Sequence, residues 1–509
     1  MFSNLPLLSI LIWLPVLGAV VVLLTGGDKN AKLARIIGSS VAFANLMLCI
    51  PLYLYFDSSS YALQFAENHL WIRVYQIHYA IGVDGISLAM IILTNFTGLL
   101  VILAGCEAIK VRVAQYMAAF LVMQGMMIGV FAATDAILFY VFWEGMLIPM
   151  YLSIGMWGSA NRSYASIKFF LYTFLGSILM LIALLYLYNQ TGTFEIQKYY
   201  GLALSSHVQE LLFFAFFLAF AVKVPMFPVH TWLPDAHTEA PSGGSVVLAA
   251  LMLKLGIYGF LRFSMPIVPE ACEALAWFMI VLSLIAIVYI GLIAIVQTDM
   301  KKLIAYSSIA HMGFATLGCF MVYDIIRHTA NYQDAYMSLE GAVVQMIAHA
   351  FGSGAMFLGV GIMADRFYNH SRLIKDYGGI ATRMPVFAAF FMLFAMSNVG
   401  LPGTAGFVGE FMVIVSALQA HFWIAFVSAL TLILAASYTL WMYKRVFFGP
   451  VANEHVAEFR DLTWLEITNY TLLAFGVFFL GLYPTPVLNV LHVTIGHLLT
   501  QSMPLSIVH

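Results

Sequence analysis

Apolar runs of about 20 residues recur from one end of this 509-residue sequence to the other. An α-helix needs that length to cross a hydrocarbon core roughly 30 Å thick. Hydrophobic residues make up 62% of the chain and charged residues only 9%, whereas a soluble domain carries about a quarter charged residues. These features exclude an ordinary soluble fold and predict an all-α polytopic membrane protein.

About fourteen transmembrane helices are expected. The approximate spans are residues 5–25, 33–56, 85–105, 115–134, 136–157, 165–188, 211–233, 244–264, 275–296, 303–321, 340–364, 385–416, 422–447 and 468–492. The first residues, Met1 to Asn4, lack the basic segment of a signal peptide, and no small-residue cleavage site follows the first run. The first helix is therefore expected to be retained.

Lysine and arginine residues fall into two groups when they are counted loop by loop. Fifteen follow odd-numbered helices: Lys29, Lys32, Arg35, Lys110, Arg112, Arg162, Lys301, Lys302, Arg366, Arg372, Lys375, Arg383, Lys444, Arg445 and Arg460. Four lie in the alternate loops: Arg73, Lys198, Arg262 and Arg327. Because positive residues are enriched in cytoplasmic loops, this asymmetry predicts a multi-pass inner-membrane protein whose two termini are periplasmic or otherwise outside.

Ionisable side chains inside the predicted spans are the first functional signal. They are Lys168, Lys223, Lys254, Glu144, Glu410, His230, His311 and His349. A charge at the bilayer centre costs about 2.5–3.5 kcal/mol on insertion scales, so such residues usually pair and mark a path for ions or protons. One pair alone could be structural, but eight residues spread over seven helices favour a path.

Two predicted spans contain helix breakers beside a charge. Pro225 and Pro228 follow Lys223, and the run Gly400–Gly403 precedes Glu410. Proline removes backbone donors, and the freed carbonyls at membrane depth must be satisfied by protein or water. A single break could be a simple kink, whereas two matched breaks predict two discontinuous helices that line a path.

The buried residues suggest individual roles. The neighbours of Glu144 in sequence offer no counter-charge, so Glu144 is predicted to pair with Lys223 from another helix. A carboxylate partner favours the charged lysine and burial disfavours it, so making or breaking the pair could load or unload a proton. Lys254 is central in its span, and the relay runs on through His311 and His349 to Glu410, because histidine titrates near neutral pH.

Three further residues have open alternatives. His230 and Asp235 follow the first break and belong either to a gate or to an ordinary helix end. Lys168 lies a few residues into its helix, where it either takes part in proton transfer or reaches back to the interface. A buried histidine such as His311 is also often a hydrogen-bonded core residue.

The two discontinuous helices are the seventh and twelfth of the series, which suggests two five-helix repeats. Because five is odd, the repeats must be inverted, a recurring plan among transporters. The expected divisions are residues 1–114 (helices 1–3), 115–264 (first repeat), 265–447 (second repeat) and 448–509 (a loop and helix 14). Each repeat would supply a half-channel that opens to one face.

The sequence predicts no bound cofactor in this chain. The four cysteines, Cys49, Cys106, Cys272 and Cys319, are far apart and form no metal-ligand spacing, so we interpret them as inert packing residues. No glycine-rich nucleotide loop joins a strand to a helix. NAD, flavin, iron–sulfur clusters, metal ions and nucleic acid are therefore not expected to bind here.

Four long segments resemble a known family over nearly the whole chain. They are FYVFWEGMLIPMYLSIGMWG, FAVKVPMFPVHTWLPDAHTEAPSGGSVVLAALMLKLGIYGFLRF, TDMKKLIAYSSIAHMGF and GLPGTAGFVGEF. These segments are similar to the antiporter-like membrane subunits of respiratory complex I, the proton-pumping NADH:quinone oxidoreductase. Glu410 is typical of the M type, because the related L and N types are expected to have lysine there.

The resemblance implies a proton-translocating subunit driven by redox chemistry in other subunits. NADH, FMN, iron–sulfur clusters and quinone are expected in those partners, and the L-type and N-type subunits are the expected neighbours in the lipid bilayer. It implies these roles: Glu144 and Lys223 as the first ion pair, Lys254 as the central lysine, His311 and His349 as relays, and Glu410 as the distal acid. Asp135, at a short outer turn, is expected to affect the contact with a neighbour.

Two other functions compete with this one. The D-type subunit of a multisubunit sodium/proton antiporter would carry almost the same charged core, and flavin and iron–sulfur absorption in the native assembly would separate the two. A structural spacer would tolerate loss of Glu144 or Lys223 without loss of pumping.

Overall fold

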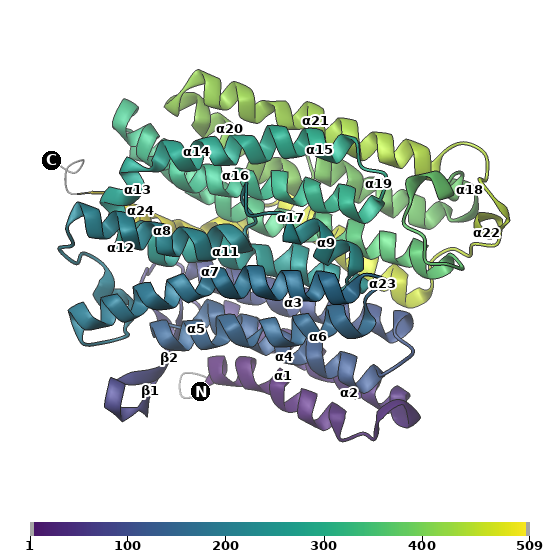
Figure 1. The fold of residues 1–509 in the computed structure, drawn as a ribbon, viewed down its shortest axis with the longest axis horizontal. Helices are drawn as coiled ribbons and strands as arrows, with labels where there is room; N and C mark the ends of the chain where they lie inside the picture. Colours follow the sequence, from purple (N-terminus) through teal and green to yellow (C-terminus); the bar gives the residue numbers. More distant parts are fainter. Residues whose placement is uncertain (1–4, 505–509) are drawn as a thin grey trace.

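The computed structural model describes residues 5–504, so the expectation for Met1 to Asn4 lies outside the described residues. Within that range, helices that cross the bundle run side by side along its long direction (Figure 1). The continuous spans are α1 (Leu7–Leu23), α2 (Ala31–Leu54), α3 (Gly85–Ala108), α4 (Val113–Ala132), α7 (Arg162–Thr191), α16 (Met300–Thr329), α17 (Tyr332–Arg366) and α21 (Phe422–Phe447).

Six further spans are interrupted. They are α5 (Ala136–Gly145) with α6 (Leu147–Trp157), α8 (Ser206–Lys223) with α9 (Trp232–Glu239), α10 (Ser242–Val247) to α12 (Met265–Ile267), α14 (Ala276–Ile285) with α15 (Gly291–Ile295), α19 (Pro385–Val399) with α20 (Ala405–Ala420), and α23 (Trp464–Leu482) with α24 (Thr485–Ser502). Twelve helical stretches in the described range are individually long and apolar enough to cross a membrane. With α1 and the joined α19 and α20, they give the fourteen spans predicted.

Both predicted breaks are confirmed. α8 ends at Lys223, and α9 does not begin until Trp232. α19 ends at Val399, and Gly400 and Gly403 adopt the left-handed conformations (φ 82° and 88°) that glycine allows without a steric penalty. The predicted spans 211–233 and 385–416 were therefore right in position but are each two helices.

The last predicted span, 468–492, is wrong as a single helix. α23 ends at Leu482, and α24 starts after Pro484 with Pro486 in its first turn. Proline fixes φ and lacks an N–H, so it suits a helix start and ends the helix before it. This is a third break, and it places α24 against α3.

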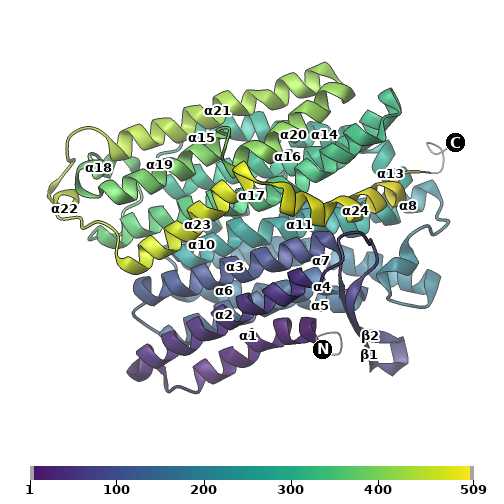
Figure 2. The ribbon, with the colours of Figure 1, turned by 180° about the vertical axis from the view of Figure 1, so that it is seen from behind.

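A β-hairpin lies outside the helical spans and was not predicted. β1 (Gln64–Ile72) pairs antiparallel with β2 (Ile77–Val83) around the turn η3 (Arg73–Tyr75). It protrudes at the end of the bundle where α1 starts and α24 ends (Figures 1 and 2). Most residues of β1 are exposed, so the apolar pattern of a buried element is missing there.

Short elements complete the connections. They are η2 (Gly27–Asn30), η4 (Ile196–Tyr199), η5 (Leu248–Met252), α11 (Leu253–Gly259), η6 (Phe260–Ser264), α13 (Pro269–Ala274), η7 (Ala286–Ile290), η8 (Ile374–Asp376), α18 (Ile380–Arg383) and α22 (Glu454–Ala457). η5, η6 and η7 are π-helical turns. α1 and α21 form opposite edges of the bundle (Figures 1 and 2), while α16, α17 and the span from α10 to α12 are almost wholly buried in its middle.

Candidate functional site

Lys254 lies at the centre of the bundle, in a span that is buried on every side. The turn before it, η5, is π-helical, and such turns are frequent at functional sites because the regular backbone ladder is interrupted there. The Nζ of Lys254 donates to the carbonyl oxygen of Ala249 in this turn at 2.5 Å. The distorted helix thus supplies a partner for its own buried lysine.

His349 in α17 is the second partner of Lys254. Its Nδ1 lies 2.7 Å from the Nζ of Lys254, while its Nε2 is buried without a hydrogen-bond partner among the described residues. An imidazole can bind a proton on either ring nitrogen. The contact therefore joins a proton carrier to a group that can pass a proton onward.

His311 in α16 continues the line from His349 to Glu410 in α20. The two imidazole rings have centroids 5.9 Å apart, and Nδ1 of His311 lies 2.6 Å from Oε1 of Glu410. The same oxygen accepts from Nε2 of Gln345 at 3.0 Å. Lys254, His349, His311 and Glu410 therefore form a contiguous buried series, which we call the central line.

The order of the two histidines in the central line differs from the predicted order. The predicted order placed His311 before His349, whereas the structure places His349 beside Lys254 and His311 beside Glu410. The reason is that α17 packs directly against η5, while α16 packs against α20. The order of helices along the chain does not determine their order in space.

A small cavity lies beside the central line. Its volume is about 10 Å³, which is close to the space that one water molecule requires. His311, His349, Ser397, Asn398 and Glu410 are among the residues around it. The cavity gives a water molecule polar partners at the point where the two imidazole rings approach the distal acid.

Gly406 keeps α20 close to this cavity, and the substitution Gly406→Ala is expected to displace α20. A Cβ at Gly406 would lie 1.9 Å from the carbonyl oxygen of Ser397. Overpacking of this kind costs about 1–3 kcal/mol. We expect a lower thermal midpoint of the purified assembly and slower proton pumping. Gly354→Ala is the control, because its Cβ would make only ordinary contacts at 3.7 Å or more; equal effects of the two variants would contradict the prediction.

Glu144 and Lys223 do not make the predicted direct contact. Within residues 5–504, Oε1 of Glu144 and Nζ of Lys223 are each buried without a hydrogen-bond partner, and no ion pair joins them, although the two groups interact electrostatically. The ammonium instead lies 5.2 Å from the ring centre of Trp143 and 6.0 Å from that of Phe169. Aromatic faces attract cations, which explains how the lysine is held away from the carboxylate.

The position of Lys223 follows from the first break. Lys223 is the last residue of α8, where the unpaired carbonyls carry partial negative charge that suits an ammonium group. Glu144 is likewise near a helix end, one residue before α5 stops at Gly145. The two charges thus lie at the ends of α8 and α5.

Lys168, Asp235 and His230, whose roles the sequence left open, fall into two groups in the structure. Lys168 and Asp235 form an ion pair of 2.7 Å, with exposed side-chain fractions of 19% and 30%. Such partial exposure is typical of a pair at the edge of the bundle. His230 is buried in the broken segment, with Nδ1 unpartnered and its ring against Phe227.

Asp135 anchors the start of α5. Its carboxylate accepts from the backbone N–H groups of Ile137 and Leu138, and from that of His78 in β2. Burial raises the pKa of Asp135, although these hydrogen bonds oppose the shift. The residue ties a transmembrane helix to the hairpin, and its predicted effect on a neighbouring subunit stays a prediction.

Two buried basic residues near the central line were missed. His237 in α9 is fully buried, neither ring nitrogen has a hydrogen-bond partner in residues 5–504, and the ring stacks on Phe357 at 4.2 Å. Lys301, counted above with a cytoplasmic loop, is only 4% exposed and donates to the carbonyl oxygen of Ala240 at 2.7 Å. His237 interacts electrostatically with Lys254 of the central line and with Lys301. The second histidine of the HTWLPDAH segment was the available signal.

No cluster of three or more His, Cys, Asp or Glu residues in the described part of the chain is arranged to hold a metal ion. The four cysteines are free, and three of them are buried.

Comparison with known proteins identifies the family. The chain is 45% identical to NADH-quinone oxidoreductase subunit M of Rhodobacter capsulatus over 97% of this chain and 96% of the relative. The chain belongs to the subunit M family of NADH-quinone oxidoreductases. Subunit 4 of plant mitochondria is similar too: NADH-ubiquinone oxidoreductase chain 4 of Marchantia polymorpha is 41% identical, with coverage of 98% and 97%.

A family model and a solved structure agree with this assignment. The model described as NADH:quinone oxidoreductase/Mrp antiporter, TM, matches residues 133–435, a segment that contains all the candidate site residues. A chain of respiratory complex I from Thermus thermophilus superposes with a TM-score of 0.87 at 27% identity, covering 98% of this chain and all of that one. The predicted family and the antiporter-like fold are confirmed.

A more distant structure shares the fold of this chain, which by itself says nothing about function. A chain of the Mrp complex from Dietzia has a TM-score of 0.79 at 21% identity, covering 97% of this chain and 52% of that one, and shows a shared fold only. As a subunit M, the present chain is a multi-pass membrane subunit of the proton-translocating NADH:quinone oxidoreductase, with other complex I subunits as its partners.

Proposed function

We propose that this chain carries protons from the cytoplasmic to the periplasmic side through Glu144, Lys223 and the central line. The observation that carries the proposal is the buried series in which Lys254 contacts His349, His311 contacts Glu410, and the two imidazole rings lie with their centroids 5.9 Å apart. Buried ionisable residues in a membrane are costly and usually mark a proton path. A solely structural role would be served by isolated pairs instead of a series.

Each segment of the path has a distinct part. Glu144 changes the proton affinity of Lys223 through space, because a nearby negative charge favours the protonated amine. No hydrogen bond joins Lys223 to Lys254 in residues 5–504, and we propose that water carries the proton across that step. Along the central line the two imidazole rings then pass it to Glu410.

The energy for the path comes from partner subunits. NADH oxidation and quinone reduction, with FMN and iron–sulfur clusters, take place there, and the L-type and N-type subunits are the proposed membrane neighbours. The lysine- and arginine-rich loops place the cytoplasmic side, and both termini then lie on the periplasmic side of the inner membrane.

Lys254→Met tests the proposal in the assembled complex. Methionine keeps a flexible apolar chain and removes the proton-binding amine. We expect NADH-driven proton pumping to fall by about tenfold or more, a barrier change of about 1.4 kcal/mol. His349→Ala is expected to have a milder effect, because water can enter the space that the imidazole leaves. Pumping is measured in proteoliposomes, with subunit content checked by gel; a fully assembled Lys254→Met complex that pumps normally would refute the relay.

A further inference from the structure

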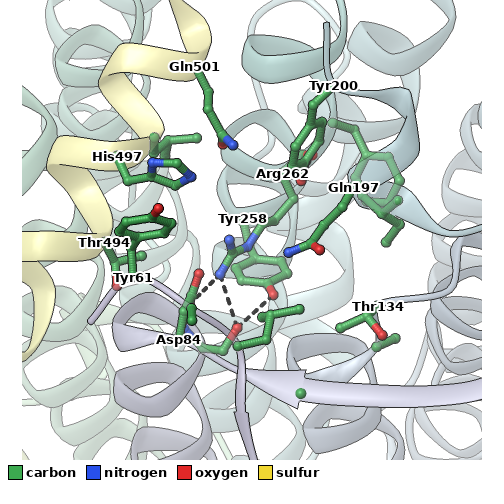
Figure 3. A pocket seen from close by; sticks show the side chains of 18 of the residues that line it. Tyr61, Asp84, Thr134, Gln197, Tyr200, Tyr258, Arg262, Thr494, His497 and Gln501 are labelled. Atoms are coloured by element: carbon green, nitrogen blue, oxygen red, sulfur yellow. Dashed lines mark hydrogen bonds and ion pairs between the residues drawn. The ribbon is translucent and has the colours of Figure 1, made fainter. Parts of the chain in front are cut away.

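The polar pocket at the hairpin end of the bundle satisfies its own charged groups (Figure 3). Arg262 forms an ion pair with Asp84 and also donates to the Oγ of Ser87 at 3.2 Å. The Ser87 hydroxyl lies 2.9 Å from the hydroxyl of Tyr258. Within residues 5–504, none of the buried side-chain atoms without a hydrogen-bond partner belongs to a residue that lines this pocket. The pocket therefore offers a ligand no unsatisfied buried group.

A second polar cavity lies at the opposite end of the bundle, between the last turns of α3 and α17 and the first turns of α10 and α23. Its volume is about 340 Å³, and we call it the inner cavity. α3, α10 and α17 pack against one another, and α23 packs against α3 and α17. The loop charges predict that this end faces the cytoplasm.

Trp464 indicates the depth of the inner cavity in the membrane. It is the first residue of α23, and it is 82% exposed. Tryptophan is enriched at the level of the lipid head groups. Because Glu466 lines the cavity only two residues further along the same helix, the cavity lies near head-group depth.

Asn469 contributes an unsatisfied acceptor to the inner cavity. The residue is 1% exposed, and its Oδ1 is buried without a hydrogen-bond partner among the described residues. Buried polar atoms in folded proteins are nearly always paired, because an unpaired one loses its hydration without compensation. The orphaned oxygen therefore indicates a donor that enters the cavity.

Acids outnumber bases among the residues that line the inner cavity. Arg366 and Glu466 neutralise each other in a two-point contact, with nitrogen–oxygen distances of 3.0 and 2.7 Å. Glu107, Asp365 and Lys110 remain, which leaves one negative charge in excess. The loops at this end are rich in lysine and arginine, so the surrounding composition does not explain an acidic cavity.

The two remaining acids differ in their partners. Asp365 interacts electrostatically with His370 and Lys301, which lie outside the cavity wall. Glu107 is exposed at the rim and accepts from the neutral hydroxyl of Thr463 at 2.8 Å. Glu107 is therefore the acid best placed to hold a cation from outside the chain.

Apolar side chains complete the wall of the inner cavity. They are Leu103, Leu358, Ile362 and Leu465. A cavity that joins hydrogen-bond acceptors to an apolar wall at head-group depth suits an amphipathic molecule better than a small ion. In addition, no three His, Cys, Asp or Glu residues of the described chain are arranged to hold a metal ion.

We propose that the inner cavity binds a phospholipid whose head group carries a primary ammonium, as phosphatidylethanolamine does. The ammonium donates to Oδ1 of Asn469 and to the carboxylate of Glu107, and Lys110 at the rim attracts the phosphate. The start of an acyl chain packs on the apolar wall. This inference goes beyond the proposed function and does not depend on the proton path.

Two other occupants explain less or make a different prediction. Water would satisfy Asn469, but it would neither balance the excess negative charge nor use the apolar wall. A lysine side chain of a neighbouring subunit carries the same ammonium, but it would keep a lipid out of the cavity in the assembled complex.

The first test compares two competing lipids on the assembled complex. A photoreactive phosphatidylethanolamine with a diazirine in its acyl chain labels the purified complex, and mass spectrometry locates the label. We expect labelled peptides from the last turns of α3 and the first turns of α23. Unlabelled dioleoylphosphatidylethanolamine should displace the probe about tenfold better than dioleoylphosphatidylcholine, because methylation removes every N–H donor from the ammonium. Equal displacement, or no label on these helices, would overturn the inference.

The second test changes the two acceptors. Glu107→Gln removes the charge and keeps an oxygen that can accept from Thr463, while Asn469→Leu removes the buried amide. We expect each variant to lower labelling of α3 and α23 severalfold at equal subunit content. Glu454→Gln, an exposed acid in α22 that does not line the cavity, is the matched control and should label normally.

The exposed position of Glu107 keeps this test decisive if Asn469→Leu fails to assemble. Labelling of Glu107→Gln that equals labelling of Glu454→Gln would reject the site. Reduced labelling of Glu107→Gln, together with preference for the primary ammonium in the competition, would support it.

Discussion

Glu144→Ala is expected to abolish NADH-driven proton pumping in an assembled complex. The carboxylate lies near a helix end, with Oε1 buried and unpartnered, and interacts electrostatically with Lys223 and Ser177. Removing it leaves a fully buried ammonium without its counter-charge, which favours the neutral amine. Lys223 then has no means of changing its proton affinity in step with the cycle.

The size of the expected loss of pumping follows from the lack of a direct contact between Glu144 and Lys223 in the described residues. Because Glu144 acts on Lys223 through space, its charge matters more than its shape, and Glu144→Gln should fail as completely as Glu144→Ala. We expect pumping below about a tenth of the normal rate, a barrier increase of at least about 1.4 kcal/mol. The measurement is the initial rate of NADH-driven acidification in proteoliposomes of known subunit content.

Glu210→Ala is the matched control for Glu144. Glu210 is an exposed acid in α8, the helix that ends at Lys223. It should pump normally. An assembled Glu144→Ala complex that pumps as well as Glu210→Ala would support a structural spacer instead of a relay.

Glu410→Gln is expected to stop proton transfer at the other end of the path. Glu410 is 2% exposed, and its Oε1 accepts from both His311 and Gln345. Glutamine fills nearly the same space but cannot bind and release a proton near neutral pH. The amide oxygen can still accept a hydrogen bond from His311 but cannot take up its proton, so we expect pumping to fall by about tenfold or more.

A second buried acid provides the control for Glu410. Glu340 in α17 is 7% exposed and contacts His492 at 3.3 Å, away from the central line. Glu340→Gln therefore makes the same chemical change at similar depth. Similar pumping rates in Glu340→Gln and Glu410→Gln would show that burial of an acid, and not its place in the line, sets the effect.

Helix positions were predictable because a membrane imposes strong rules on sequence. Backbone groups have no water partners in the hydrocarbon, so each crossing must be a long apolar helix, and its length is readable. The breaks beside Lys223 and before Glu410 were predictable for the same reason, since proline and glycine interrupt the ladder. The break at Pro484 carried the same signal but no neighbouring charge.

The hairpin and the two missed basic residues were harder to predict. The exposed β1 strand lacks the alternation of a half-buried strand, so no pattern indicated it. Lys301 lies at the start of α16 and reads as a loop residue, yet neighbouring helices bury it. His237 lies in a segment that follows a break, where hydropathy says little about burial.

The sequence by itself determined that this chain spans a membrane about fourteen times, that several ionisable residues lie within the spans, and where two helices break. Those features depend on local composition and on the cost of exposing backbone or charge to lipid. Only the tertiary structure decided that His349 and not His311 contacts Lys254, and that the Lys223 ammonium lies against the rings of Trp143 and Phe169 with no ion pair to Glu144 among the described residues. These contacts depend on how helices far apart in the chain pack together, and no local pattern records that packing.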